Sequence, residues 1–347
     1  MSKDILPSDY EAFLQSIKTQ VQQAQLQALV AVNKELILLY WHIGRGILER
    51  QEKQGWGTRV IEQLSRDLHA AFSQIKGFSL RNLGYMKVFA KAYPDEQILQ
   101  QVVAKLPWGH NIVLLEKVKD ETERFWYIQK TIEHGWSRNV LVHQINTNLY
   151  QRQGKAITNF QSTLPALQSD LAHNIIKDPY VFDFITTDDD TKERHLQSAL
   201  LAHIQRFLLE LGIGFTFVGS NYHMVVGDED FYLDLLFYHL HLRCFVVIEL
   251  KKGSFKSEHA GKMNFYLVVV DKQIKQPSDN PTIGIILCET KSKVTAGYAL
   301  TNISSPMGVA TYNTASLPDE LKDQLPDVKQ LEASLQQVKK SIEDGDE

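Results

Sequence analysis

FYLDLLFYHLHLRCFVVIELKKG, residues 231–253, decides the fold of the C-terminal half of this chain. It holds two apolar runs rich in β-branched and aromatic residues, joined by a short connection. Such runs are typical of β-strands, and the short connection favours their pairing as neighbours. Because side chains alternate between the two faces of a strand, Glu249 and Lys251 share one face, and pairing can bring Asp234 to that face as well.

Two converging carboxylates form an oxygen-ligand site of the kind that Mg²⁺ prefers, completed by waters and substrate phosphate oxygens. A lysine beside such a metal can orient or help to deprotonate the attacking water, and it can offset the charge that grows on a phosphorane. The pattern therefore indicates a metal-dependent site formed by Asp234, Glu249 and Lys251. The simpler alternative is an ion pair between two strands, with no chemistry attached.

The surrounding sequence predicts an α/β domain with a mixed sheet. A helix is expected over residues 192–212, followed by two short strand-like runs between 214 and 227. After the central pair come a helix around 261–270, a fully apolar run at 282–290 and a last strand at 307–313. A fully apolar run suits a strand that is buried on both faces. The predicted order is helix, antiparallel meander, helix, strand.

Residues 10–150 predict helices, because apolar residues return every three or four positions. The clearest helix starts at Ser79, a favourable N-cap, and stops at Pro94, which cannot continue it. Its predicted buried stripe is Leu83, Met86, Phe89, Ala90 and Tyr93. With the helix before it, this helix could form a helix-turn-helix that presents a nucleic-acid-binding face to a major groove, formed by Arg81, Asn82, Lys87 and Lys91. Helical hairpins with a basic face also occur in domains that never contact DNA.

The length of 347 residues suggests two domains. We expect a helical domain at 1–155, a polar linker at 156–178, an α/β domain at 179–317 and a charged helical tail at 318–347. Residues 1–156 carry 20 Lys and Arg against 15 Asp and Glu, whereas the remaining residues carry 17 against 26. A basic half that touches a polyanion and an acidic half that holds metal ions would give this asymmetry, and ordinary surface scatter explains it equally well.

Several features bear on the compartment of the protein. No stretch approaches the roughly 18 apolar residues that a membrane span needs, and the N-terminus has no apolar run. Cys244 and Cys288 both lie in apolar runs, where a thiol behaves as a small buried hydrophobe. We therefore expect a cytoplasmic protein with no membrane contact and no disulfide. For His239 and His241, the end of a strand beside a turn is favoured over a zinc site, because no third ligand lies nearby.

Four segments resemble the catalytic domain of the YhcG-like family, a branch of the PD-(D/E)xK nuclease superfamily: LLAHIQRFLLELGIGFTFVGS, FYLDLLFYH, CFVVIELKKGSF and GKMNFYL. Four others resemble the helical domain that accompanies it: YWHIGRGILERQ, GWGTRVIEQLSRDL, GFSLRNLGYMKVFAKAYP and LPWGHN. The resemblance implies a restriction-endonuclease-like αβββαβ core and a nucleic-acid phosphodiester as the substrate. It also implies Asp234 and Glu249 as metal ligands, the backbone carbonyl of Leu250 as a further ligand, and Lys251 as the catalytic lysine.

The chain departs from the family pattern at several supporting positions. Where the first helix usually supplies a glutamate, this chain has Gln197, and Glu193 lies four residues earlier on the same helical face. The glutamine usually found four residues before Tyr266 is Lys262. The usual Arg-Gln pair after the glycine of the first strand is Ser220 and Asn221. These changes alter the residues around the predicted site and leave its Asp, Glu and Lys intact.

Together these observations predict a nuclease that uses Mg²⁺, with Mn²⁺ as a second usable ion, and that acts on DNA in repair, recombination or defence. The helical domain would position DNA or a partner, and a homodimer is one expected assembly. A catalytically impaired nuclease fold that binds nucleic acid or a protein is the main alternative, motivated by Gln197, Lys262 and the net charge of −4. A third reading is an assembly protein that oligomerises through its helical half.

Overall fold

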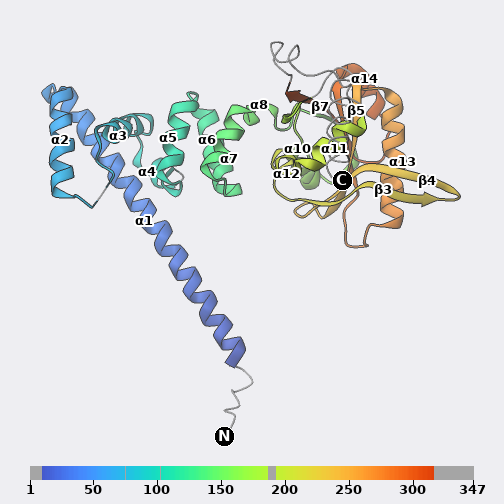
Figure 1. Cartoon of the computed structure of the whole chain (residues 1–347), viewed down its shortest axis with the longest axis horizontal. Helices are drawn as coiled ribbons and strands as arrows, with labels where there is room; N and C mark the ends of the chain where they lie inside the picture. Colours follow the sequence, from blue (N-terminus) through green and yellow to red (C-terminus); the bar gives the residue numbers. More distant parts are fainter. Residues whose placement is uncertain (1–9, 75, 102, 187–192, 316–347) are drawn as a thin grey trace, which may run out of the picture. The chain divides into compact units, whose positions relative to one another are not determined.

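The computed structural model describes residues 10–74, 76–101, 103–186 and 193–315 of the chain. The chain divides into two compact units, residues 1–150 and 151–347, coloured from blue to green and from green to red in Figure 1. The described part of the first unit is helical: α1 (Tyr10–Gln54), α2 (Thr58–Ala71), α3 (Leu80–Ala92), α4 (Glu96–Gln101), η1 (Val103–Lys105), α5 (Trp108–Lys117), α6 (Glu121–His134) and α7 (Arg138–Asn146). Helix α8 (Leu149–Arg152) spans the division.

Helix α3 follows the sequence prediction closely. The Ser79 side chain accepts a hydrogen bond from the backbone N–H of Asn82, which caps the helix, and the helix ends before Pro94. The predicted stripe is buried in full: Leu83, Met86, Phe89, Ala90 and Tyr93. Helix α3 packs on the second half of α1, and Gly44 lies at their crossing. A Cβ at Gly44 would stand 2.0 Å from the carbonyl oxygen of Met86, so only glycine allows this approach.

We expect Gly44→Ala to destabilise the helical unit by about 1 kcal/mol. The added methyl group meets backbone atoms of α3, which costs about 1–3 kcal/mol, while the gain in helix propensity recovers only about 1 kcal/mol. Gly46→Ala is the matched control, because a Cβ there meets only the far end of the Arg50 side chain at 3.3 Å. All five tryptophans precede residue 151, so denaturant unfolding followed by tryptophan fluorescence reports on this unit. Equal midpoints for the two variants would contradict the expectation.

The second unit is built on one seven-stranded sheet, in the order β1-β7-β6-β5-β4-β3, with β2 paired to β7. Strands β3, β4 and β5 form an antiparallel meander, and β5, β6 and β7 run parallel. Its elements are β1 (Ile157–Thr158), α9 (Phe160–Thr163), α10 (Ala166–Ile175), β2 (Tyr180–Thr186), α11 (Glu193–Ala202), α12 (Ile204–Leu211), β3 (Phe215–Val226), β4 (Glu229–His239), β5 (Cys244–Ser254), α13 (Ser257–Gln273), β6 (Ile283–Thr290), α14 (Lys293–Leu300) and β7 (Met307–Ala315).

Helices cover both faces of the sheet, so the central strands are apolar on both sides. Leu235 and Ile248 face a core that includes α11 and α12, whereas Leu236 and Val247 face a core formed with α13 and α14. Figure 1 shows α10, α11 and α12 on one side of the strands and α13 on the other. This is the predicted α/β class with a mixed sheet, and the αβββαβ order is present from α11 to β6.

Two elements of the second unit differ in their boundaries from the sequence prediction. The helix expected at 192–212 is broken at His203, which has φ −113° and ψ 37°, into α11 and α12. The two runs expected between 214 and 227 form the single strand β3, whose register shifts between Phe217 and Gly219. The sequence resembles two strands because the polar residues Ser220 and Asn221 separate the two apolar runs, although both residues lie inside β3.

The segment predicted as a linker, 156–178, is part of the second unit. Its strand β1 pairs with β7, and Ala172 and Ile176 are buried in the core beside α12. Its polar residues are used inside the fold: the Asn159 side chain donates to the carbonyls of Ile303 and Ser305 and accepts from the N–H of Met307. The tail predicted at 318–347 lies outside the described residues. Among the described helices, none combines the length and apolarity that a membrane crossing requires.

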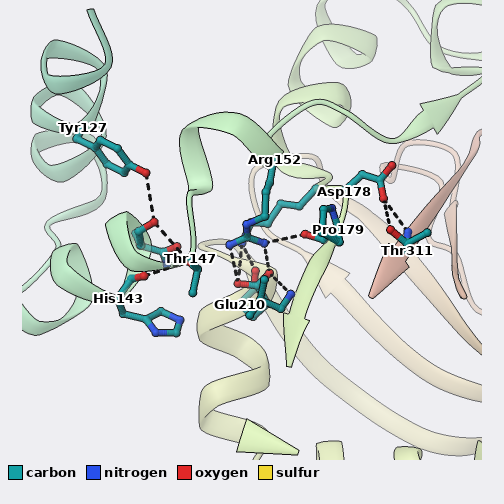
Figure 2. A network of polar contacts seen from close by, with 11 residues as sticks. Tyr127, His143, Thr147, Arg152, Asp178, Pro179, Glu210 and Thr311 are labelled. Carbon is teal, nitrogen blue, oxygen red and sulfur yellow. Dashed lines mark hydrogen bonds and ion pairs between the residues drawn. The ribbon is translucent and has the colours of Figure 1, made fainter. Parts of the chain in front are cut away.

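A buried ionic network ties the start of the second unit to its core (Figure 2). The Arg152 guanidinium contacts both carboxylate oxygens of Glu210 on α12, at 2.5 and 3.4 Å, and donates to the carbonyl of Pro179. Glu210 is fully buried and also accepts from the backbone N–H of Val181 at 2.9 Å. The ammonium of Lys177 lies 3.9 Å from the same carboxylate, and burial lowers the pKa of Lys177 to about 8.

A second, partly buried ion pair in the same unit joins Asp178 to the sheet. Lys291 donates to Asp178 and to the carbonyl of Val309. Asp178 also accepts from both the N–H and the hydroxyl of Thr311 on β7 (Figure 2). The predicted linker is therefore fixed to the sheet by charged hydrogen bonds at its C-terminal end. Polar composition alone made this segment resemble a connection between domains.

Candidate active site

The pairing of β4 with β5 brings the two acidic residues together. Leu235 on β4 lies opposite Ile248 on β5, so Asp234 and Glu249 occupy the next position along the ladder. The N–H of Asp234 donates to Glu249 Oε1 at 3.3 Å, and the N–H of Leu250 donates to Asp234 Oδ2 at 2.8 Å. The two carboxylates converge at the end of the paired segment, as the alternation of side chains predicts.

Lys251 joins this pair from the same face of β5. Its Nζ atom lies 3.4 Å from Glu249 Oε2 and 4.0 Å from Asp234 Oδ2, and it donates to the carbonyl oxygen of Leu250 at 2.8 Å. The ammonium therefore touches all three groups that the family resemblance implies as metal ligands. Its side chain is 12% exposed, so it is held against the carboxylates and not free in solvent.

The carboxylates are held in an environment that penalises their charge. Burial raises the pKa of Asp234, and the Leu250 N–H and the Lys251 ammonium offset only part of that effect. Burial also raises the pKa of Glu249, and the neighbouring Asp234 carboxylate raises it further. Two acids that repel each other in a buried place favour the binding of a cation, because a cation restores the charged form of both.

The two supporting residues predicted on α11 both reach the site. Glu193, the first residue of α11, lies 3.2 Å from Lys251 Nζ through Oε2 and accepts from the backbone N–H of Lys252 through Oε1. Gln197 is buried and donates from Nε2 to the carbonyl oxygen of Asp234 at 2.6 Å. Glu193 thus holds the lysine, and Gln197 holds the backbone that carries the aspartate.

Lys262 brings a second cation to the same glutamate from α13. Its Nζ atom lies 3.3 Å from Glu249 Oε2 and 5.0 Å from the centre of the Tyr266 ring. Burial lowers the pKa of Lys262, but the attraction of Glu249 and the hydrogen bonds to Tyr266 and Glu249 outweigh it, and the pKa is raised. Glu249 Oε2 therefore lies between the ammonium groups of Lys251 and Lys262.

Tyr312 is a contact that sequence reasoning missed. It lies on β7, two strands away from β5 in the sheet, and its hydroxyl donates to the carbonyl oxygen of Lys251 at 3.4 Å. Nothing in the local sequence links Tyr312 to the site, because the contact depends on the order of the strands.

Ser220 lies opposite Leu235 across the β3–β4 pair, one residue from Asp234, and Asn221 has a positive φ of 45°.

The donor set fits a hard divalent cation. Within the described residues, no group of three or more His, Cys, Asp and Glu side chains could hold a metal ion, so the candidate ligands are two carboxylates and one backbone carbonyl. Such a set suits Mg²⁺, which takes one or two carboxylates and keeps several waters. The ammonium of Lys251 stands among these oxygens as a stand-in cation, which indicates that they converge on one positive charge.

The predicted nucleic-acid-binding residues on α3 differ in what they contact. Arg81 is exposed and lies 2.8 Å from the Tyr85 hydroxyl, Lys91 is exposed, and Lys87 is half-buried. Asn82 does not face solvent as expected, because its amide links α3 to the rest of the unit. Its Oδ1 accepts from the Trp108 indole at 2.7 Å, and its Nδ2 donates to the carbonyl of Gly77.

The histidines predicted beside a turn are found there. His239 ends β4 and is buried, and its Nδ1 accepts from the N–H of Leu242. Burial lowers the pKa of His239 to about 4. Cys244 and Cys288 are buried free thiols, and burial raises their pKa values to about 12 and about 11.

Family models match most of the chain. A model described as the YhcG PDDEXK nuclease domain matches residues 173–326, and a model described as the DUF1016 N-terminal domain matches residues 16–152. A protein of Escherichia coli (strain K12) that carries the name "Putative nuclease YhcG" is 31% identical over 361 residues, covering 94% of this chain and 93% of that protein. The nuclease-domain model spans Asp234, Glu249 and Lys251.

Solved structures give weaker likenesses. A repair endonuclease from Pyrococcus abyssi is similar with a TM-score of 0.26 and 14% identity, over 38% of this chain and 50% of that one. The apo form of EndoMS is similar with a TM-score of 0.25 and 11% identity, over 38% of this chain and 49% of that one. The chain thus spans about half the length of each of these two structures.

Proposed function

The chain belongs to the YhcG family, whose C-terminal part is a PDDEXK nuclease domain, and from this premise we propose that it is a Mg²⁺-dependent nuclease that hydrolyses phosphodiester bonds of DNA. Asp234 and Glu249 are the proposed metal-ligating side chains, with the Leu250 carbonyl as a third ligand, and Lys251 is the proposed catalytic lysine. One observation supports this assignment above the others: a single ammonium, that of Lys251, contacts all three proposed ligands at 4.0 Å or less.

A divalent ion held by these oxygens would supply a Lewis acid for the scissile phosphate and lower the pKa of a bound water. Three side chains of the protein would have the remaining roles in the reaction. Lys251 would place its ammonium beside the reacting phosphate, where it can orient the attacking water and offset the charge that develops. Glu193 would hold that ammonium in position, and Gln197 would hold the backbone at Asp234.

The test is cleavage of duplex, single-stranded and branched DNA, with matched RNA, in Mg²⁺, in Mn²⁺ and in EDTA. We expect cleavage of DNA in either metal and none in EDTA, with activity restored by added Mg²⁺. Cleavage that continues unchanged in EDTA would overturn the assignment of a metal site. A preference for RNA would keep the site and overturn the proposed substrate.

A second candidate function is a nuclease fold that binds nucleic acid without cleaving it. The specific observation that favours it is the position of Lys262, which places a second ammonium 3.3 Å from Glu249 Oε2. Two lysines on one carboxylate oxygen compete with a metal for that oxygen. This candidate predicts DNA binding that is the same in Mg²⁺ and in EDTA, with no product formed in either.

We expect Lys262→Gln to lower the Mg²⁺ concentration that gives half-maximal cleavage by roughly 3–10-fold. The substitution removes one competing charge from Glu249 and installs the residue that the family usually has there. The effect stays moderate because the Lys262 side chain is 48% exposed and water screens it. Lys272→Gln is the matched control, since it makes the same change at an exposed position of α13. A rise in the half-maximal concentration would show that Lys262 assists the reaction.

A further inference from the structure

The first half of α1 carries an apolar seam with nothing packed on it within the described residues. Seven of the twelve apolar residues from Tyr10 to Ala31 follow alternating steps of four and three residues, and Ala12, Phe13, Leu26, Leu29 and Val30 lie off this spacing. The seven are Tyr10, Leu14, Ile17, Val21, Ala24, Ala28 and Ala31. These are the a and d positions of three heptads, a period of 3.5 residues that marks a coiled-coil seam. Tyr10, Ile17 and Val21 are 41%, 40% and 49% exposed.

The seam ends where α1 meets the rest of the helical unit. The next a position is Glu35, and Asn33 already donates to the carbonyls of Ala104 and Leu106. Beyond that point α1 is covered by α3 and η1, and Ile37 is fully buried. In Figure 1 the blue N-terminal half of α1 runs on past the other helices of its unit. An isolated helix of this length is only marginally stable in water, so we expect the exposed seam to pack against another helix.

The near absence of charge on this segment favours a second copy of the chain as the partner. Between residues 12 and 33 the only charged residue is Lys18, and all six glutamines lie outside the seam. An acidic or basic partner would find no complementary charge here, and a membrane-surface helix would need a basic polar face. Two copies of a charge-free heptad face meet without like-charge repulsion and match each other in register. Residues 316–347 carry nine acids against four lysines, so they too lack a counterpart on α1.

We infer that residues 10–31 of α1 form a coiled coil with the same segment of a second copy of the chain, and that the protein is a homodimer through this seam. The apolar side chains of the seam interlock in the a and d layers, and the small alanines at positions 24, 28 and 31 fill their layers less fully than larger apolar residues would. The dimer is independent of the metal site and of the proposed nuclease reaction.

The test is the mass of the full chain by sedimentation over a hundredfold range of concentration, for the wild type and two variants. Val21→Glu places a charge in the seam and should raise the dissociation constant of the dimer roughly tenfold or more. Gln22→Glu introduces the same side chain one residue along, outside the seam, and should change it less than threefold. Circular dichroism of both variants checks that the helical unit remains folded.

Ala24→Leu supplies a test in the opposite direction. Leucine at a d position favours two-stranded coiled coils, so this variant should lower the dissociation constant roughly tenfold. A wild type with the mass of one chain at every concentration would overturn the inference and would leave the seam to residues 316–347 or to another protein. Equal effects of Val21→Glu and Gln22→Glu on a dimeric wild type would place the interface elsewhere and would also overturn it.

Discussion

Asp234→Asn is expected to lower the rate of cleavage roughly 10³-fold, because it removes one of the two charged ligands proposed for the metal ion. A bound metal supplies several kcal/mol of transition-state stabilisation, and each 1.4 kcal/mol is worth a factor of ten in rate. Asparagine is nearly the same size and can still accept the hydrogen bond that the Leu250 N–H gives to Oδ2. The geometry of β4 and β5 should therefore survive the substitution.

The stability of this variant separates chemistry from folding. Burial raises the pKa of Asp234, which means that the charged carboxylate destabilises the folded state at neutral pH. We therefore expect Asp234→Asn to unfold at the same denaturant concentration as the wild type or at a higher one, while calorimetric titration shows weaker binding of Mg²⁺ or Mn²⁺. Asp228→Asn, at an exposed position in the same hairpin, is the control and should keep full activity.

Lys251→Ala distinguishes the proposed nuclease from a binding module. In the nuclease, loss of the ammonium should lower the rate by roughly 10²–10³-fold, the range found when a single charge-stabilising donor is removed from an active site. Affinity for the metal should stay the same or increase, because the ammonium contacts the same oxygens. If cleavage is unaffected in both variants, the activity does not come from this site.

The core of the candidate site could be predicted because it depends on local rules. Glu249 and Lys251 share a face through the two-residue period of a strand, and a short connection brings Asp234 beside them. The residues around them depend on tertiary placement that no local rule gives. Tyr312 reaches Lys251 only because β7 lies two strands from β5, and Glu193 reaches it only through the docking of α11. The metal site was predicted from the two converging carboxylates, whereas the nucleic-acid substrate came from the family resemblance.

The misplaced boundaries have equally physical causes. The apolar spacing Leu196, Leu200, Phe207, Leu211 continues through His203 without interruption, so periodicity cannot reveal the break between α11 and α12. Residues 156–178 are polar because they satisfy buried backbone groups, as Asn159 does near β7. Composition predicts exposure for such residues, and only the paired groups in the fold show why they are inside.

The charges around Glu249 bear directly on the choice between the two candidate functions. Its carboxylate is 2% exposed, yet it has two ammonium groups within 3.4 Å and another carboxylate beside it. With Glu193 at 3.2 Å from Lys251, the cluster holds three carboxylates against two ammonium groups, and a divalent ion that binds Glu249 Oε2 competes with both lysines for that oxygen. Lys262, on the exposed side, is the easier of the two to displace, since its side chain is 48% exposed and that of Lys251 is 12% exposed.

Glu210→Ala is expected to destabilise the second unit by about 3–5 kcal/mol, the range for removal of one partner from a buried ion pair. The substitution leaves the buried Arg152 and Lys177 without their carboxylate and leaves the Val181 N–H without its acceptor. Glu210→Gln keeps an acceptor for Val181 and should fall between the wild type and Glu210→Ala. Glu258→Ala, whose exposed carboxylate is 3.7 Å from Lys256, should change stability by less than about 0.5 kcal/mol.

The loss of stability in Glu210→Ala should depend on pH, and it should be detected by circular dichroism. The pKa of Lys177 is lowered to about 8, and the Glu210 carboxylate is the group that holds it up against burial, so Glu210→Ala should lower it further. At pH 7 the wild type keeps Lys177 charged and paired, whereas at pH 9 Lys177 is largely neutral in both folded proteins. The loss of stability should therefore shrink as the pH rises from 7 to 9. All five tryptophans precede residue 151, so tryptophan fluorescence reports on the helical unit and not on the second unit. The shift of the unfolding midpoint should therefore appear in circular dichroism and not in tryptophan fluorescence. A shift of the fluorescence transition instead would show that Glu210 stabilises the helical unit.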